Sequence, residues 1–185
     1  KAIKEAHDDV EENPPQTDGD NLENGVDNNL QISDKETDKE KKEETLAEVV
    51  SLVEEPQDET DHPPVPSLDN CDLSELDLSD LDFLSISIQN ANLTKAILNR
   101  ANLSNSSLVK TSLANANLND TNLSETDLSD ANLSQAILEG ANLEGSLLNR
   151  ANLSDAMLER ANLRKCKLIE SNLTNANLNE VTCGL

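Results

Sequence analysis

Large apolar residues recur at every fifth position of this chain, from Leu73 to Leu178. The series has 22 consecutive members, and 20 of them are leucine. Two positions before each member stands a smaller residue, most often alanine, and the residue between the two is mostly Asn or Asp. We call these the central, small and outward positions of a five-residue repeat. Such an unbroken repeat indicates a stacked architecture in which each unit packs against its neighbours.

A five-residue period fits neither of the ordinary regular structures. An α-helix advances by about 100° per residue, so leucines spaced five apart would be distributed around its axis. A strand alternates its faces at every residue, so an odd period would send successive leucines to opposite faces. The leucines share one interior when the chain turns a corner once per repeat. The pattern therefore predicts a solenoid whose flat sides are one pentapeptide long.

Many of the repeats begin with Ala-Asn-Leu, as at Ala91–Leu93, Ala131–Leu133 and Ala161–Leu163. This pattern resembles the pentapeptide-repeat proteins over residues 68 to about 183. The resemblance implies an all-β fold, a right-handed quadrilateral β-helix with four pentapeptides per coil, so that every fourth repeat stacks. Central residues on one side would then form a core ladder, comprising Leu93, Leu113, Leu133, Leu153 and Leu173.

The same geometry assigns the other repeat positions. The small residues point inward, where a tight corner leaves little room. The Asn and Asp residues at the outward positions face solvent, and their stacked amides can hydrogen-bond along the axis. We expect such an amide ladder at Asn132, Asn152 and Asn172.

Residues 1–67 have a different composition from the repeats. They contain 6 basic and 21 acidic residues, whereas residues 68–185 contain 8 and 16. A strongly acidic segment with few apolar residues cannot bury enough surface to offset its chain entropy. We therefore predict two parts: a largely disordered acidic tail and linker over 1–67, and a repeat domain over 68–185.

One stretch of the tail, at about 34–55, predicts an α-helix. Ser33 and Glu36 have the spacing of a capping box, and Pro56 ends the segment. The helix would either bind a partner or cover the first coil, or it would be a marginal helix within a disordered tail. Its apolar residues recur at helical spacing, namely Leu46, Val49, Val50 and Val53.

Both ends of the repeat array depart from the pattern. Leu76, Leu81 and Ile86 occupy small positions in the first coil, and larger residues are expected where a solenoid begins and needs a cap. After Glu180 the repeat dissolves, and the last coil would expose its backbone edge. Such an edge invites pairing with another chain, so a homodimer through a solenoid end is one hypothesis.

Four outward positions that should be polar are apolar instead: Ile97, Ile137, Leu147 and Met157. With four repeats per coil, Ile97, Ile137 and Met157 belong to one column, whereas Leu147 lies on another side. We interpret the column, flanked by Arg100 and Arg160, as a possible protein-contact site. The alternative is that these are scattered surface apolar residues, which are common in folded proteins.

The sequence offers little support for catalysis, a cofactor or a metal. The histidines, His7 and His62, lie outside the repeats, so we expect no histidine-based catalytic site in the solenoid. The acidic residues of the first coil could attract a hard cation but are typical of a solvated face. Two of the three cysteines occupy small positions, where cysteine behaves as a small hydrophobe. We therefore predict no catalytic residues, no cofactor and no metal site.

The charge of the chain limits its partners. A formal net charge of −23 disfavours direct binding to nucleic acid. No apolar run is long enough to span a membrane. We expect a non-enzymatic scaffold or protein-interaction module, soluble, and either cytoplasmic or exported with its signal already removed. The alternative follows from the resemblance: some pentapeptide-repeat proteins are DNA mimics that bind type II topoisomerases such as gyrase and confer quinolone resistance.

Overall fold

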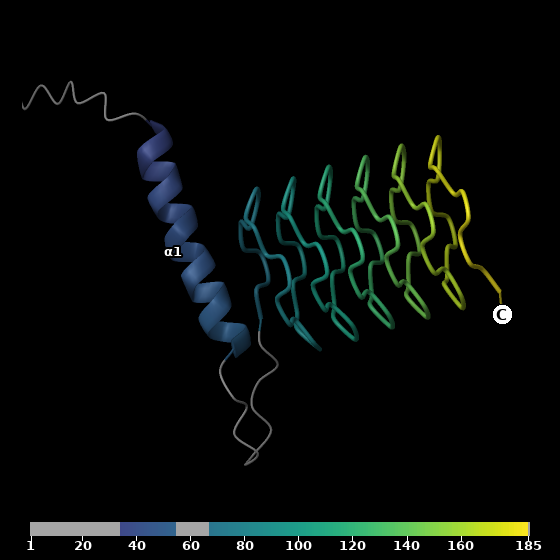
Figure 1. Cartoon of the computed structure of the whole chain (residues 1–185), viewed down its shortest axis with the longest axis horizontal. Coiled ribbons are helices and arrows are strands. Elements are labelled where there is room, and N and C mark those ends of the chain that lie inside the picture. The colour runs from purple at the N-terminus through teal and green to yellow at the C-terminus, as the bar shows by residue number, and fades with distance from the viewer. Residues whose placement is uncertain (1–33, 55–66, 185) are drawn as a thin grey trace, which may run out of the picture. The chain divides into compact units, whose positions relative to one another are not determined.

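The computed structural model of the chain describes residues 34–54 and 67–184 (Figure 1). The predicted disordered segment before residue 34 and most of the predicted linker lie outside these residues. The described residues fall within one compact unit, Ser33–Leu185. Its described residues form an α-helix, α1, followed by the coils of the repeat array.

The predicted helix is confirmed as α1, Asp34–Glu54. Val49 is its most buried described residue, at 1% exposed, and it belongs to the same apolar cluster as the central residues of the coils. Leu46 and Leu52 pack against this cluster, whereas Val50 is half-buried. The packed residues are therefore spaced at i, i+3 and i+6. The predicted stripe contained Leu46 and Val49 but missed Leu52, because periodicity cannot say how a helix is rotated on its support.

The coils contain four pentapeptides each, as the resemblance implied. Parallel β-bridges join outward residues 20 apart, from Ser67↔Ser87 at the start to Asn162↔Thr182 at the end. The coils follow one another in a single stack, coloured teal to yellow in Figure 1. Leu68 precedes the predicted series and already occupies a central position, because its N–H donates to the carbonyl of Ser87 at 2.7 Å.

The sides of the coil are shorter than ordinary strands. One residue per pentapeptide, the outward one, forms an isolated bridge, so the described residues contain bridges rather than extended strands. The cause is the turn that follows each central residue. In the repeat beginning at Ala91, for example, the N–H of Ala96 donates to the carbonyl of Leu93 at 3.0 Å and closes a β-turn.

The third residue of each turn has a positive φ, as a type II turn requires. This left-handed conformation is adopted by 21 residues other than glycine, from Asn70 to Glu180, with φ between 55° and 63°. It costs an ordinary L-residue about 1–2 kcal/mol. Gly140 and Gly145 hold the same position without this cost.

The interior is apolar and closely filled. Central residues from Leu93 to Leu158 are at most 1% exposed. Burying each leucine contributes about 1.5–3 kcal/mol before chain entropy is subtracted. Hydroxyl groups at small positions are buried too, and four of them donate to a backbone carbonyl of the preceding coil: Ser106 to Phe83, Thr111 to Ile88, Thr121 to Leu98 and Thr126 to Leu103.

The amide ladder expected at Asn132, Asn152 and Asn172 is confirmed. Asn152 donates its Nδ2 to Oδ1 of Asn132 at 3.2 Å, and Asn172 donates to Asn152 at 3.0 Å. A second ladder runs on another side of the solenoid. There each amide also donates to the residue 20 positions earlier, through Asp82, Asn102, Asn122, Asn142 and Asn162.

The buried leucine column generates a first prediction. Leu123 is fully buried, so Leu123→Asp places an unpaired carboxylate in the core, and we expect it to destabilise the domain by several kcal/mol or unfold it. Asn115→Asp adds the same charge at an exposed turn position and serves as the control. Thermal denaturation followed by circular dichroism compares the two. A Leu123→Asp chain that melts like the parent would contradict the interior assignment.

The left-handed turn position generates a second prediction. Gln135 is exposed with φ of 59°. A β-branched residue tolerates this conformation poorly, so Gln135→Val should lower the free energy of unfolding by about 1–2 kcal/mol. Gln135→Gly should leave stability unchanged or raise it by up to about 1 kcal/mol. Denaturant titration measures both, and equal stabilities for the two variants would argue against the positive φ.

Candidate functional site

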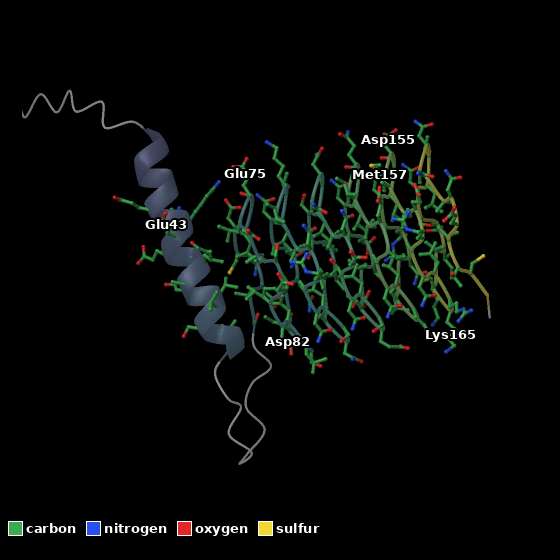
Figure 2. All side chains as sticks on the ribbon, in the orientation of Figure 1. Glu43, Glu75, Asp82, Asp155, Met157 and Lys165 are labelled. Carbon is green, nitrogen blue, oxygen red and sulfur yellow. The ribbon has the colours of Figure 1, made fainter. Side chains whose placement is uncertain are left out.

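The apolar residues Ile97, Ile137 and Met157 occupy one column on the outside of the coils. Bridges run from Ile97 to Asn117, from Asn117 to Ile137 and from Ile137 to Met157, so one polar residue interrupts the column. Ile97 is 37% exposed and Met157 is 40% exposed, whereas Ile137 is half-buried. Met157 lies on the outer surface of the coils in Figure 2. The structure therefore places the three predicted contact residues in one column, with Ile137 and Met157 adjacent and Ile97 two coils before Ile137.

Leu147 lies in a different column, as expected. It bridges Asp127 and Lys167 and is half-buried. Its neighbours in that column are charged residues, so it adds nothing to the apolar surface around Ile137. Leu147 is therefore a matched control for experiments on the column.

The two arginines beside the column are paired within the chain. Arg100 makes a bidentate contact with Asp80, at 2.7 Å from Nε and 2.6 Å from Nη2. The hydrogen bonds from Arg100 hold the pKa of Asp80 below its ordinary value. Arg160 contacts Glu159 at 2.9 Å and Glu139 at 3.6 Å. The rim of the column is thus composed of ion pairs rather than isolated cations.

The same pairing recurs at other turns of the solenoid. Arg150 makes a bidentate contact with Asp130, with both distances at 2.7 Å, and Lys165 contacts Glu144 at 2.8 Å. Residues 20 or 21 positions apart stand next to each other at a turn, which explains the regularity. Exposed pairs of this kind contribute little to stability. Their effect here is to interrupt the acidic surface with basic side chains.

Two exposed apolar residues escaped the sequence analysis. Leu84 is 53% exposed and Ile169 is 65% exposed. Both follow a central residue directly, at a position that is mostly polar in other repeats. Testing this position for departures, as well as the outward one, would have found them.

The acidic residues of the first coil are held by hydrogen bonds from their own repeats. Asp72 and Asp77 accept the backbone N–H of Ser74 and Ser79, and Asp72 also accepts the amide of Asn92. Hydrogen bonds from the neighbouring serines hold the pKa of both aspartates below the ordinary value. Among the described residues, no three His, Cys, Asp or Glu side chains are placed to hold a metal ion.

The cysteines and histidines are the other candidate reactive groups. Cys166 donates a hydrogen bond to the carbonyl of Leu143 at 2.9 Å, and burial raises the pKa of its thiol, which lowers its reactivity. Cys71 is half-buried and Cys183 exposed. His7 and His62 lie outside the described residues. Within the described part of the chain, no helix has the length and apolar character needed to cross a membrane.

Comparison with known proteins places the chain among repeat proteins. A family model described as pentapeptide repeats matches residues 86–124, 126–164 and 158–183, in eight copies, and these ranges together cover just over half of the chain. A search of curated proteins finds no match.

Similar solved structures include three repeat proteins. Full-length QnrB1, a plasmid-mediated fluoroquinolone resistance protein, is 20% identical over 64% of this chain and 65% of that chain, with a TM-score of 0.40. A pentapeptide repeat protein from the Arabidopsis thaliana thylakoid lumen is 25% identical over 56% and 68%, with a TM-score of 0.28. HetL, which is involved in heterocyst differentiation regulation in Nostoc sp. strain PCC 7120, is 26% identical over 63% and 73%, with a TM-score of 0.22.

These likenesses do not identify a function. The match spans less than two thirds of the QnrB1 chain, and all three TM-scores are below 0.5. The family itself rests on the repeat sequence, which the stacked coils of four pentapeptides explain physically. The chain belongs to the pentapeptide-repeat family.

Proposed function

We propose that this chain is a non-enzymatic protein-interaction module whose contact surface is the apolar column of Ile97, Ile137 and Met157. The observation that supports the proposal most directly is the exposure of two of these residues at positions that are polar in most repeats. A solenoid does not need apolar residues there, because its core is filled by the central and small positions. Apolar groups that are dispensable for packing and stand in one column are typical of a binding surface.

The ion pairs at the rim suit this function. Arg100 and Arg160 present planar guanidinium groups held by carboxylates, which lowers the entropy lost when a partner binds them. A polar rim around an apolar centre is the usual arrangement of a protein interface. The fold also provides a stiff support, since each coil is joined to the next by backbone hydrogen bonds on every side.

A gyrase-directed DNA mimic is the second candidate. A net negative charge on the repeats favours it, whereas the ion pairs at Asp80, Asp130 and Glu144 interrupt the acidic surface along the turns. A supercoiling assay separates the candidates. If the chain neither inhibits gyrase nor protects it from a quinolone at micromolar concentration, the mimic is excluded.

Two further features of the chain stay proposals. We divide it functionally at residue 67, between an acidic tail and the repeats.

A homodimer through a solenoid end draws support from the last coil, where Leu178 is 40% exposed while Leu158, one coil earlier, is fully buried. Light scattering over a range of concentrations would exclude the dimer by giving the monomer mass throughout.

The interaction surface generates a third prediction. The double variant Ile137→Asn with Met157→Asn restores the polar residue that other repeats carry, so the fold should be retained. We expect affinity capture with this variant to lose the partner that the parent chain retains. Circular dichroism verifies the fold, and Leu147→Asn is the control because it makes the same change on another side.

The outcome distinguishes the column from the rest of the chain. Capture that is unchanged in the double variant would contradict the proposal. A chain lacking residues 1–67, tested in parallel, tells whether the repeats or the segment before them recruit the partner. If the partner is captured only when residues 1–67 are present, the column would also be excluded as its binding surface.

A further inference from the structure

The first coil, residues 68–87, is covered by α1. Val49 of α1 is 1% exposed, and Lys42 Nζ lies 2.9 Å from Oε2 of Glu75. In this coil the small positions hold Leu76, Leu81 and Ile86 instead of alanine, and Leu76 and Ile86 are nearly fully buried. The coil thus presents a broader apolar end than an interior coil would. This end accepts a helix whose apolar residues are spaced at i, i+3 and i+6.

The first coil also carries most of the net negative charge of the repeats, −6 of −8. Residues 68–87 contain six acidic residues and no basic residue, whereas residues 88–185 contain ten acidic and eight basic residues. The charge of the later coils is therefore nearly balanced, and that of the first coil is not. The six acidic residues are Asp69, Asp72, Glu75, Asp77, Asp80 and Asp82.

The helix that covers this acidic coil is itself acidic. α1 contains eight acidic and four basic residues. Glu40, Glu44 and Glu48 are exposed on it. Lys42 relieves part of the repulsion, since hydrogen bonds from Lys42 and Lys95 hold the pKa of Glu75 below its ordinary value. The apolar residues of α1 therefore pack on the coil, whereas the net charge of α1 has the same sign as that of the coil and weakens the contact.

Like charges within about a Debye length weaken an association, and opposite charges strengthen it. A helix with the apolar spacing of α1 and a basic polar face would fit the first coil better than α1 does. We propose that the first coil is a docking surface for a basic amphipathic helix of a partner protein, and that α1 occupies this surface until the partner displaces it. The surface adjoins the start of the apolar column, since Asp77 bridges Ile97 and Asp80 pairs with Arg100, but its apolar part is the end of the coil rather than the side.

The short apolar contact of α1 makes displacement feasible. Of its described residues, Val49 is buried, while Leu46 and Leu52 are partly buried. An interior coil, by comparison, buries four central and four small residues and is hydrogen-bonded on both edges. Elements with few buried contacts open at low free energy. Because α1 belongs to the same chain as the coils, its effective concentration at the first coil is high. A partner helix must bind tightly enough to compete with it.

Two synthetic peptides test the proposal against the 185-residue chain. The first is residues 34–54 as they stand, and the second is the same peptide with Glu40→Lys, Glu44→Lys and Glu48→Lys. Each is labelled with a fluorophore, and binding is measured by fluorescence anisotropy. We expect the basic peptide to bind roughly tenfold more tightly than the native peptide, with an affinity that falls as salt is added.

Variants of the peptide and the chain localise the binding. Val49→Asp in the basic peptide should abolish binding, because the buried contact is lost while the peptide stays strongly basic. Val49→Asp in the chain should release α1 and strengthen binding of the basic peptide. Glu75→Gln with Asp77→Asn should weaken binding, whereas Glu170→Gln, in the last coils, is the control and should not.

Three results would overturn the proposal. Equal affinities of the native and basic peptides would show that charge does not select the occupant. If the basic peptide still binds after Val49→Asp, its binding is electrostatic and does not use the apolar end of the coil. Self-association of the Val49→Asp chain in place of peptide binding would identify a second copy as the occupant. Circular dichroism of each chain variant verifies that the coils remain folded.

Discussion

The structure depends on bringing a leucine to a common axis once in every five residues. Neither a helix nor a straight strand can do this, so the chain must change direction after each central residue. A β-turn makes this change, and its third residue must adopt a positive φ. The strain at 21 residues other than glycine is offset by the burial of a large apolar residue, leucine in most repeats, at each central position from Leu68 to Leu163. The interior and the turns are therefore two consequences of one constraint.

The same constraint organises the outer surface. Because each side is one pentapeptide long, a single outward residue per side meets its counterpart in the next coil. Identical residues then stack, and asparagine is well suited to stacking because its amide can donate to the carbonyl oxygen of the amide before it. The donor always belongs to the later coil, so the ladder has a direction. Asp82, which accepts but cannot donate when ionised, begins one of these ladders.

Function is expected where the repeat pattern is broken. A residue that obeys the pattern is already explained by packing, by the turn or by the ladder. Ile97, Ile137 and Met157 are explained by none of these. The single acidic residues of the first coil follow the pattern, since Asp82 begins an amide ladder, but the pattern does not require a coil without any basic residue. The two surfaces differ in character. The column is apolar with paired charges at its rim, whereas the first coil combines a broad apolar end with an excess of carboxylates. One module could therefore hold two different partners.

The sequence by itself determined the repeat, the inward and outward positions, the column of Ile97, Ile137 and Met157, and the α-helix near 34–55. The period of five requires the chain to turn a corner once per repeat, and the resemblance to the pentapeptide-repeat proteins supplied the four repeats per coil that place these residues in one column. The helix followed from its own capping and apolar spacing. The sequence did not show that each side would be a single bridged residue, because that depends on where the turn begins. It also missed Leu52 of α1 and the pairing of Arg100 with Asp80 and of Arg160 with Glu159. These contacts join side chains whose meeting depends on how the helix is rotated and how side chains extend at the turns.

The tertiary structure alone brings α1 and the first coil into one apolar cluster. The sequence gives the spacing of apolar residues within each element but not the surface on which they pack.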